Sequence, residues 1–139
     1  MHARHLVTAG AGLSLLAAFI HAWVMPEHLA EWWGYGAFFL VAAIFQTLYA
    51  LVLLRHPESW LLRLGIATNL ALITLWVWTR TIGIPLVGPA AGELEPAGRI
   101  DVVAKVAEAG VVVLAALLGG RRLPPVLMSG EPIKGGRDE

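Results

Sequence analysis

Two histidines and a glutamate in the segment HAWVMPEHLAEWW have the types and spacing of a metal-binding group. His28 follows His21 by seven residues and Glu31 follows His28 by three, so on one continuous helix the three side chains share a face. Imidazole and carboxylate groups are ligands of zinc, iron, manganese and copper(II). The pattern therefore predicts a site for a divalent transition metal, with His21, His28 and Glu31 among its ligands.

Pro26 lies between the two histidines and influences how they are placed. Proline removes a helical hydrogen bond, here to Ala22, and either kinks the helix or begins a new one. In the second case residues 27–33 would form a short helix at the membrane interface. His28 and Glu31 are neighbours in both alternatives, and Glu27 directly precedes His28, where it could support the site.

Three charged residues share one face of the last apolar segment: Asp101, Lys105 and Glu108 are spaced i, i+4 and i+7. An ionisable side chain inside a membrane is costly and needs a partner. One interpretation is a ladder of ion pairs in which Lys105 neutralises one or both acids. In the alternative, Asp101 and Glu108 join the histidines as metal ligands. Two amides near mid-membrane, Gln46 and Asn69, are expected to form a hydrogen bond between helices and to support the site.

Residues 80–98, RTIGIPLVGPAAGELEPAG, form an unusually long connection. Proline fixes φ and glycine permits positive φ, so their repetition predicts a set of defined turns. In one interpretation the loop caps the bundle and brings Glu93 and Glu95 toward the metal ligands, with Arg80 pairing with one of these acids. The alternative is a rigid connector that resists proteolysis.

These residues must be positioned by helices that cross a membrane. The 139-residue chain is 58% apolar and only 14% charged, and its apolar residues are concentrated in four runs, at residues 6–25, 36–54, 61–79 and 101–118. Each run approaches the roughly 20 residues that a membrane helix needs. Short connections favour antiparallel neighbours. We therefore expect an all-α, four-helix transmembrane up-down bundle with a long Gly/Pro-rich extracytoplasmic loop between helices 3 and 4.

The distribution of basic residues predicts the orientation. Arg4, Arg55 and Arg63 fall on one side, together with the basic residues beyond position 120, which places both termini in the cytoplasm under the positive-inside rule. The expected location is the inner (plasma) membrane. Residues 1–122 form one membrane domain in this interpretation, and residues 123–139 form a cytoplasmic tail rich in proline, glycine and charge.

Composition also excludes several classes of function. The chain has no cysteine, which rules out disulfides, thiolate metal sites and cysteine nucleophiles. Its formal net charge of zero argues against a nucleic-acid partner. Pro89 and Ala90 stand where a phosphate-binding loop would need Lys and Ser or Thr after Gly88, so a nucleotide site in the loop is rejected.

The segments EHLAEWWGYGAFFLVAAIFQTLYAL and RTIGIPLVGPAAGELEPAGRID resemble a group of small bacterial four-helix membrane proteins. Their pattern is EH-x-x-EW, a Phe-rich second helix with Gln, and R-T-x-G-x-P-x-G-P-x-x-G-x-x-E-x-x-G-x-x-D. The resemblance covers residues 27 to about 108, and this chain has one residue more between Pro85 and Gly88. It implies the four-helix architecture and implies no reaction.

The sequence is consistent with three functions. The first is an outer-face His/carboxylate site that binds a divalent metal ion or a small ligand. The second is a structural or assembly subunit, either as a homo-oligomer or in a larger membrane complex. The third is a membrane enzyme acting on a lipid or quinone-like substrate, with a histidine and a buried acid as its acid–base groups. The lipid bilayer is a partner in all three.

Overall fold

The structure is a computed structural model that describes residues 3–84 and 87–120, and it consists of four helices. These are α1 (Ala3–Glu31), α2 (Trp33–Arg55), α3 (Ser59–Thr81) and α4 (Arg99–Gly119). Within the described ranges there is no β-strand, and an isolated bridge joins Ile84 to Ala91 in the loop. The prediction of an all-α fold is confirmed. The predicted tail lies outside the described residues.

All four helices are long and apolar enough to cross a membrane. They contain 29, 23, 23 and 21 residues, against the roughly 20 that span a hydrocarbon core. Many of their large apolar side chains are exposed in the isolated chain, among them Phe19, Val41, Leu48 and Val106. Such a surface suits contact with lipid. Lipid tails are themselves apolar, so apolar side chains that face them carry no hydrophobic cost.

The helix boundaries follow from local chemistry. α1 continues through Pro26 to Glu31, so His21 and His28 lie on one helix, and the alternative of a separate short helix is not observed. Trp32 adopts an extended backbone and separates α1 from α2. α4 begins after Gly98, whose N–H donates to the Asp101 carboxylate at 3.0 Å. That contact satisfies one of the unpaired donors at a helix start.

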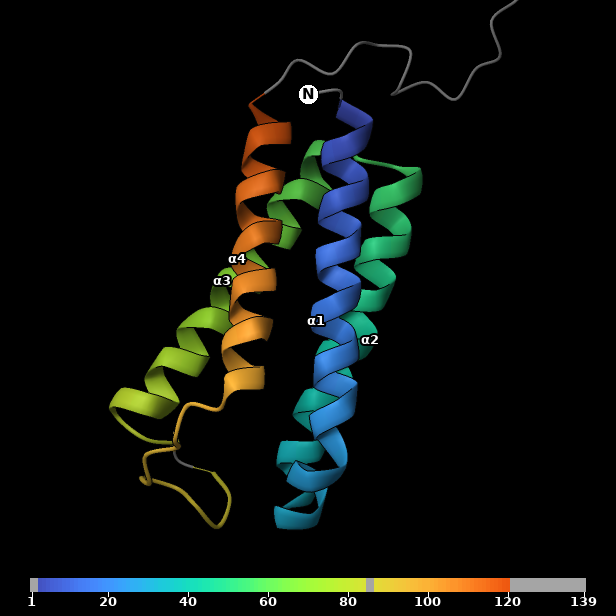
Figure 1. Cartoon of the computed structure of the whole chain (residues 1–139). Helices are drawn as coiled ribbons and strands as arrows, with labels where there is room; N and C mark the ends of the chain where they lie inside the picture. Colours follow the sequence, from blue (N-terminus) through green and yellow to red (C-terminus); the bar gives the residue numbers. More distant parts are fainter. Residues whose placement is uncertain (1–2, 85–86, 121–139) are drawn as a thin grey trace, which may run out of the picture.

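Helix α1 is central in the packing. It packs most extensively against α2 and also packs against α4 (Figure 1). Helix α3 packs mainly against α4 and has very few contacts with α2. Gly10, Ser14 and Ala18 recur every four residues along α1 and are all buried. Small side chains on this face let the backbones of neighbouring helices approach closely.

The two ends of the bundle differ. The start of α1 and the end of α4 lie at one end, here named the terminal end, and the α3–α4 loop lies at the other, here named the loop end (Figure 1). The terminal end is filled by leucines that are at most 2% exposed, including Leu6, Leu53, Leu62 and Leu118. The buried charged side chains are found toward the loop end.

Candidate functional site

The most deeply buried charged group joins α1 to α4. Glu108 is completely buried, and its Oε1 atom lies 2.9 Å from Nε2 of His21, which is itself only 3% exposed. Nζ of Lys105 donates to Oε1 at 2.8 Å and to Oε2 at 2.6 Å. The expected pairing of Lys105 with an acid is therefore observed for Glu108, and His21 shares the same carboxylate.

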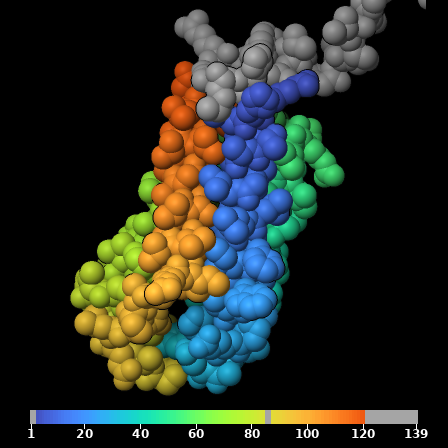
Figure 2. Space-filling view, viewed as in Figure 1, coloured from blue at the N-terminus to red at the C-terminus, as the bar shows by residue number. Residues whose placement is uncertain are grey.

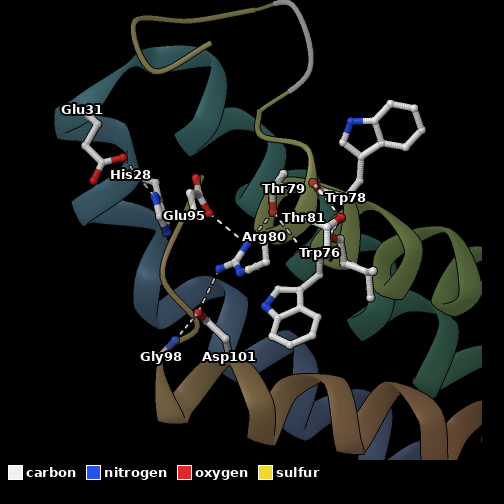
Figure 3. Close-up of polar contacts among 11 residues, drawn as sticks. His28, Glu31, Trp76, Trp78, Thr79, Arg80, Thr81, Glu95, Gly98 and Asp101 are labelled. Carbon is white, nitrogen blue, oxygen red and sulfur yellow. Dashed lines mark hydrogen bonds and ion pairs between the residues drawn. The ribbon is translucent and has the colours of Figure 1, made fainter. Parts of the chain in front are cut away.

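Arg80 organises a second charged group at the loop end. Its Nη1 atom lies 2.9 Å from the Glu95 carboxylate, and its Nη2 atom donates to Asp101 at 3.0 Å. Figure 3 shows the guanidinium held between these two acids, with the Trp76 ring beside it. The centre of the guanidinium lies 5.2 Å from the Trp76 ring centroid, within the range of a cation–π contact. Asp101 thus pairs across helices with Arg80.

A third group lies at the end of α1. Nδ1 of His28 is 3.2 Å from the Glu31 carboxylate (Figure 3). The His28 ring stacks on Phe39 with 4.3 Å between centroids. Glu31 is half exposed, so the pair is partly hydrated. Glu27 is exposed on the same helix, and Glu93 is exposed in the loop.

The sequence-predicted ligands therefore separate into three groups. His21 meets Glu108, His28 meets Glu31, and Asp101 meets Arg80. Among the residues that the structure describes, no three His, Asp or Glu side chains are placed to hold one metal ion.

A cavity of about 210 Å³ lies between these groups, toward the loop end. Its wall is mostly apolar and rich in rings, with Trp32, Tyr35, Phe38, Phe39 and Trp76 among its lining residues. His21, His28, Arg80, Glu95, Asp101 and Lys105 supply its polar part. Figure 2 shows a hollow between the α3–α4 loop with the start of α4 on one side and the last turns of α1 on the other.

Three buried nitrogen atoms of cavity-lining residues lack hydrogen-bond partners in the described part of the chain. They are Nδ1 of His21, Nε1 of Trp76 and Nε of Arg80. A buried polar atom without a partner costs about 1–3 kcal/mol, and each such atom needs an explanation. All three atoms belong to residues that line one cavity, and a ligand with polar atoms would satisfy them where neighbouring side chains make room.

The predicted amide pair lies away from this cavity. Nε2 of Gln46 donates to Oδ1 of Asn69 over a long 3.5 Å, and Ser14 donates to the Gln46 carbonyl oxygen at 2.8 Å. Both amides are fully buried and neither lines the cavity. The contact between the two amides joins α2 to α3, which is the interhelical role expected from the sequence, and the Ser14 bond to the main-chain carbonyl of Gln46 joins α1 to α2.

The loop consists of defined turns held by backbone hydrogen bonds. Ile84 N–H donates to the Glu93 carbonyl at 3.1 Å, and Glu95 N–H donates to the Thr79 carbonyl at 3.1 Å. The second bond places Glu95 next to Arg80. The Tyr35 hydroxyl donates to the Val87 carbonyl at 3.1 Å and so joins the loop to α2. The loop thus supplies part of the cavity wall, through Ile84, Val87 and Glu95.

Sequence reasoning missed the aromatic part of the site. Trp76, Tyr35 and Phe39 gave only a general signal, a cluster of rings near one membrane interface, and that pattern also fits side chains that face lipid. Trp78, two residues from Trp76, is indeed 45% exposed. Only the rotation of α3 decides which of the two rings faces the cavity.

Comparisons of the chain with protein-family models, with curated proteins and with solved structures give no match.

Proposed function

We propose that the protein binds a small, neutral, amphipathic molecule that carries oxygen atoms on a ring, of the kind found in quinone and phenol head groups. The observation that carries this proposal is the ring-lined cavity with three unpartnered buried nitrogen atoms, from His21, Trp76 and Arg80. A mostly apolar pocket with a few placed polar groups is the usual form of a small-molecule site.

The size of the cavity favours a single ring. Its volume of about 210 Å³ is below the ~300–1,000 Å³ typical of sites for drug-sized ligands. It exceeds the ~150 Å³ of an engineered apolar cavity that holds benzene. A ring with small substituents therefore fits, and any tail would extend toward lipid.

The charges favour a neutral ligand. Both cationic side chains that line the cavity are already paired, Arg80 with Glu95 and Asp101, and Lys105 with Glu108. An anionic head group would have to compete with these carboxylates. A neutral ligand leaves the ion pairs intact and uses only the unpartnered nitrogen atoms.

The same proposal includes a location. We infer an up-down, multi-pass arrangement in the inner (plasma) membrane, with both termini cytoplasmic and the loop end extracytoplasmic. The support is the basic residues Arg4, Arg55 and Arg63 near the terminal end, and the exposed Trp23, Trp33 and Trp78 near the loop end. The cavity would then lie at the depth where an amphipathic ring resides.

Equilibrium dialysis of the full chain in lipid nanodiscs tests the proposal, with 4-methylphenol and 4-methylanisole as probes and protein-free nanodiscs as the blank. We expect saturable binding of at least one probe. Leu72→Trp fills the cavity from its α3 wall and should weaken binding tenfold or more, because Leu72 lines the cavity. Leu70→Trp is the matched control, since Leu70 is 47% exposed on the same helix. Absence of saturable binding of both probes would contradict the proposal.

Divalent-metal binding is the second candidate, and one observation favours it. His21 has one ring nitrogen against a carboxylate and the other without a partner, which is how metal-bound histidines are commonly oriented. Metal analysis of the purified chain against His21→Ala tests it. Equal metal content in both would remove this candidate. The homo-oligomer, assembly-subunit and enzyme hypotheses stay predictions.

A further inference from the structure

The hydrogen bonds of Glu108 determine which nitrogen of His21 carries the proton. The Lys105 ammonium can only donate, and it donates to both oxygens of Glu108. Both oxygens therefore act as acceptors. Nε2 of His21, at 2.9 Å from Oε1, must be the donor in that contact. In the neutral imidazole the other nitrogen, Nδ1, then presents a lone pair.

That nitrogen is the one without a partner. Nδ1 of His21 is buried, and His21 lines the cavity. The two other unpartnered nitrogen atoms, Nε1 of Trp76 and Nε of Arg80, can only donate. The residues that line the cavity thus carry one unpartnered acceptor and two unpartnered donors, each covered by neighbouring atoms until side chains shift to admit a ligand. Their complement is a ligand with a hydroxyl group that donates and an oxygen that accepts.

We propose that His21, held by Glu108 and Lys105, selects ligands with a hydroxyl group on the ring, so that the site prefers a phenol to the corresponding ether or ketone. This inference rests on the proposed function and names the ligand class of the same cavity. His21 is the specificity-determining residue. Glu108 and Lys105 are positioning residues, because their contacts determine which ring nitrogen of His21 carries the proton.

The polar groups lie at two levels along α4. Glu108, which holds His21, and Asp101, which holds Arg80, are seven residues apart, or roughly 10 Å along the axis at 1.5 Å per residue. The hydroxyl at one end of the ligand would face His21, and the acceptor at the other would face Arg80 and Trp76.

The first test compares two probes that differ in one group, a hydroxyl in the first and a methoxy in the second. The hydroxyl of 4-methylphenol can donate to Nδ1, whereas 4-methylanisole has the same ring and no donor. In the wild-type chain we expect about tenfold tighter binding of the phenol, since a buried acceptor left unpaired costs about that much. If both probes bind saturably with equal affinity, the hydroxyl selection is wrong and the proposed function stands. If neither binds, the proposed function itself fails.

The second test reverses the tautomer. In Glu108→Gln, we expect Lys105 to hold the introduced amide oxygen at the Oε2 position, where its contact is shorter, at 2.6 Å against 2.8 Å, so that the amide N–H faces Nε2 of His21. Nε2 then becomes the acceptor and the proton moves to Nδ1. We expect the preference for the phenol to be lost or reversed while saturable binding persists.

A matched variant controls for the loss of charge. Glu31→Gln makes the same change in the other His–carboxylate pair, with His28, and Glu31 does not line the cavity. It should retain the wild-type preference. An unchanged preference in folded Glu108→Gln would overturn the inference. Should that variant fail to fold, the wild-type ratio of the two probes decides alone.

Discussion

The terminal end and the loop end of this bundle are built from the same four helices but differ in how closely those helices pack. At the terminal end, Leu6, Leu53 and Leu62 are at most 2% exposed and belong to one buried hydrophobic cluster. At the loop end, the helices surround a hollow with ion pairs on its wall. Dense packing gives rigidity, so the comparison shows how one small bundle combines a rigid, closely packed end with an end that contains a cavity.

The largest effect should come from opening the buried ion pair. Glu108→Ala leaves Lys105 and His21 without their shared acceptor, and breaking a buried pair typically costs about 4 kcal/mol. We expect a free energy of unfolding lower by about that amount, measured by circular dichroism during denaturation in detergent. The double variant Lys105→Met/Glu108→Leu should recover most of the loss. An unchanged unfolding midpoint in the single variant would show that the pair is not buried.

The next largest effect tests the terminal end. Leu53→Ala removes a 2%-exposed side chain from the leucine core, and such deletions cost about 3 kcal/mol. Leu54→Ala is the matched control, because Leu54 is 47% exposed and faces outward; it should cost less than about 0.5 kcal/mol. Folded Leu53→Ala should bind ring probes as the wild type does. Equal losses for the two variants would contradict the contrast between the two ends.

A smaller effect tests how the loop is held. Gly88 has φ of 86°, and a Cβ there would overlap the Tyr35 ring, so Gly88→Ala combines backbone strain with a steric clash. Gly92 has φ of 85° and open space around a Cβ, so Gly92→Ala adds strain only. We expect losses of about 2 and 1 kcal/mol respectively. Limited proteolysis within residues 87–98 should show faster cleavage in Gly88→Ala, and identical rates would argue against the Tyr35 contact.

The smallest effect is expected at the His28–Glu31 pair. Glu31 is half exposed, and ion pairs open to solvent contribute about 0–1 kcal/mol. Glu31→Gln should therefore lower the free energy of unfolding by less than about 0.5 kcal/mol, because His28 keeps its stacking on Phe39. The same denaturation experiment measures it. A loss above about 2 kcal/mol would mean that this pair is as protected as that of Glu108.

Much of the fold could be predicted from the sequence because local chemistry decides it. Runs of about 20 apolar residues specify four helices long enough for a membrane. The spacing of Lys105 and Glu108 on one helix predicted their ion pair, and the repeated prolines and glycines predicted a structured loop. The sequence predicted that Arg80 pairs with Glu93 or Glu95, and in the structure it pairs with Glu95.

The site was harder to predict, because helical periodicity gives the residues on a face but not the partner of that face. His21 and Glu108 are 87 residues apart and meet because α1 packs against α4. One of the two interpretations joined Asp101 and Glu108 to the histidines in a single metal centre, whereas in the structure Asp101 pairs with Arg80 and His28 with Glu31.

The sequence by itself determined the number of helices, their suitability for a bilayer and the presence of buried charges that need partners. The tertiary structure decided which charges pair, which of Trp76 and Trp78 faces inward, and where the cavity lies. The physical reason is that hydropathy and short-range spacing are properties of single segments. Cavities and hydrogen-bond partners depend on the rotation and tilt of each helix against its neighbours.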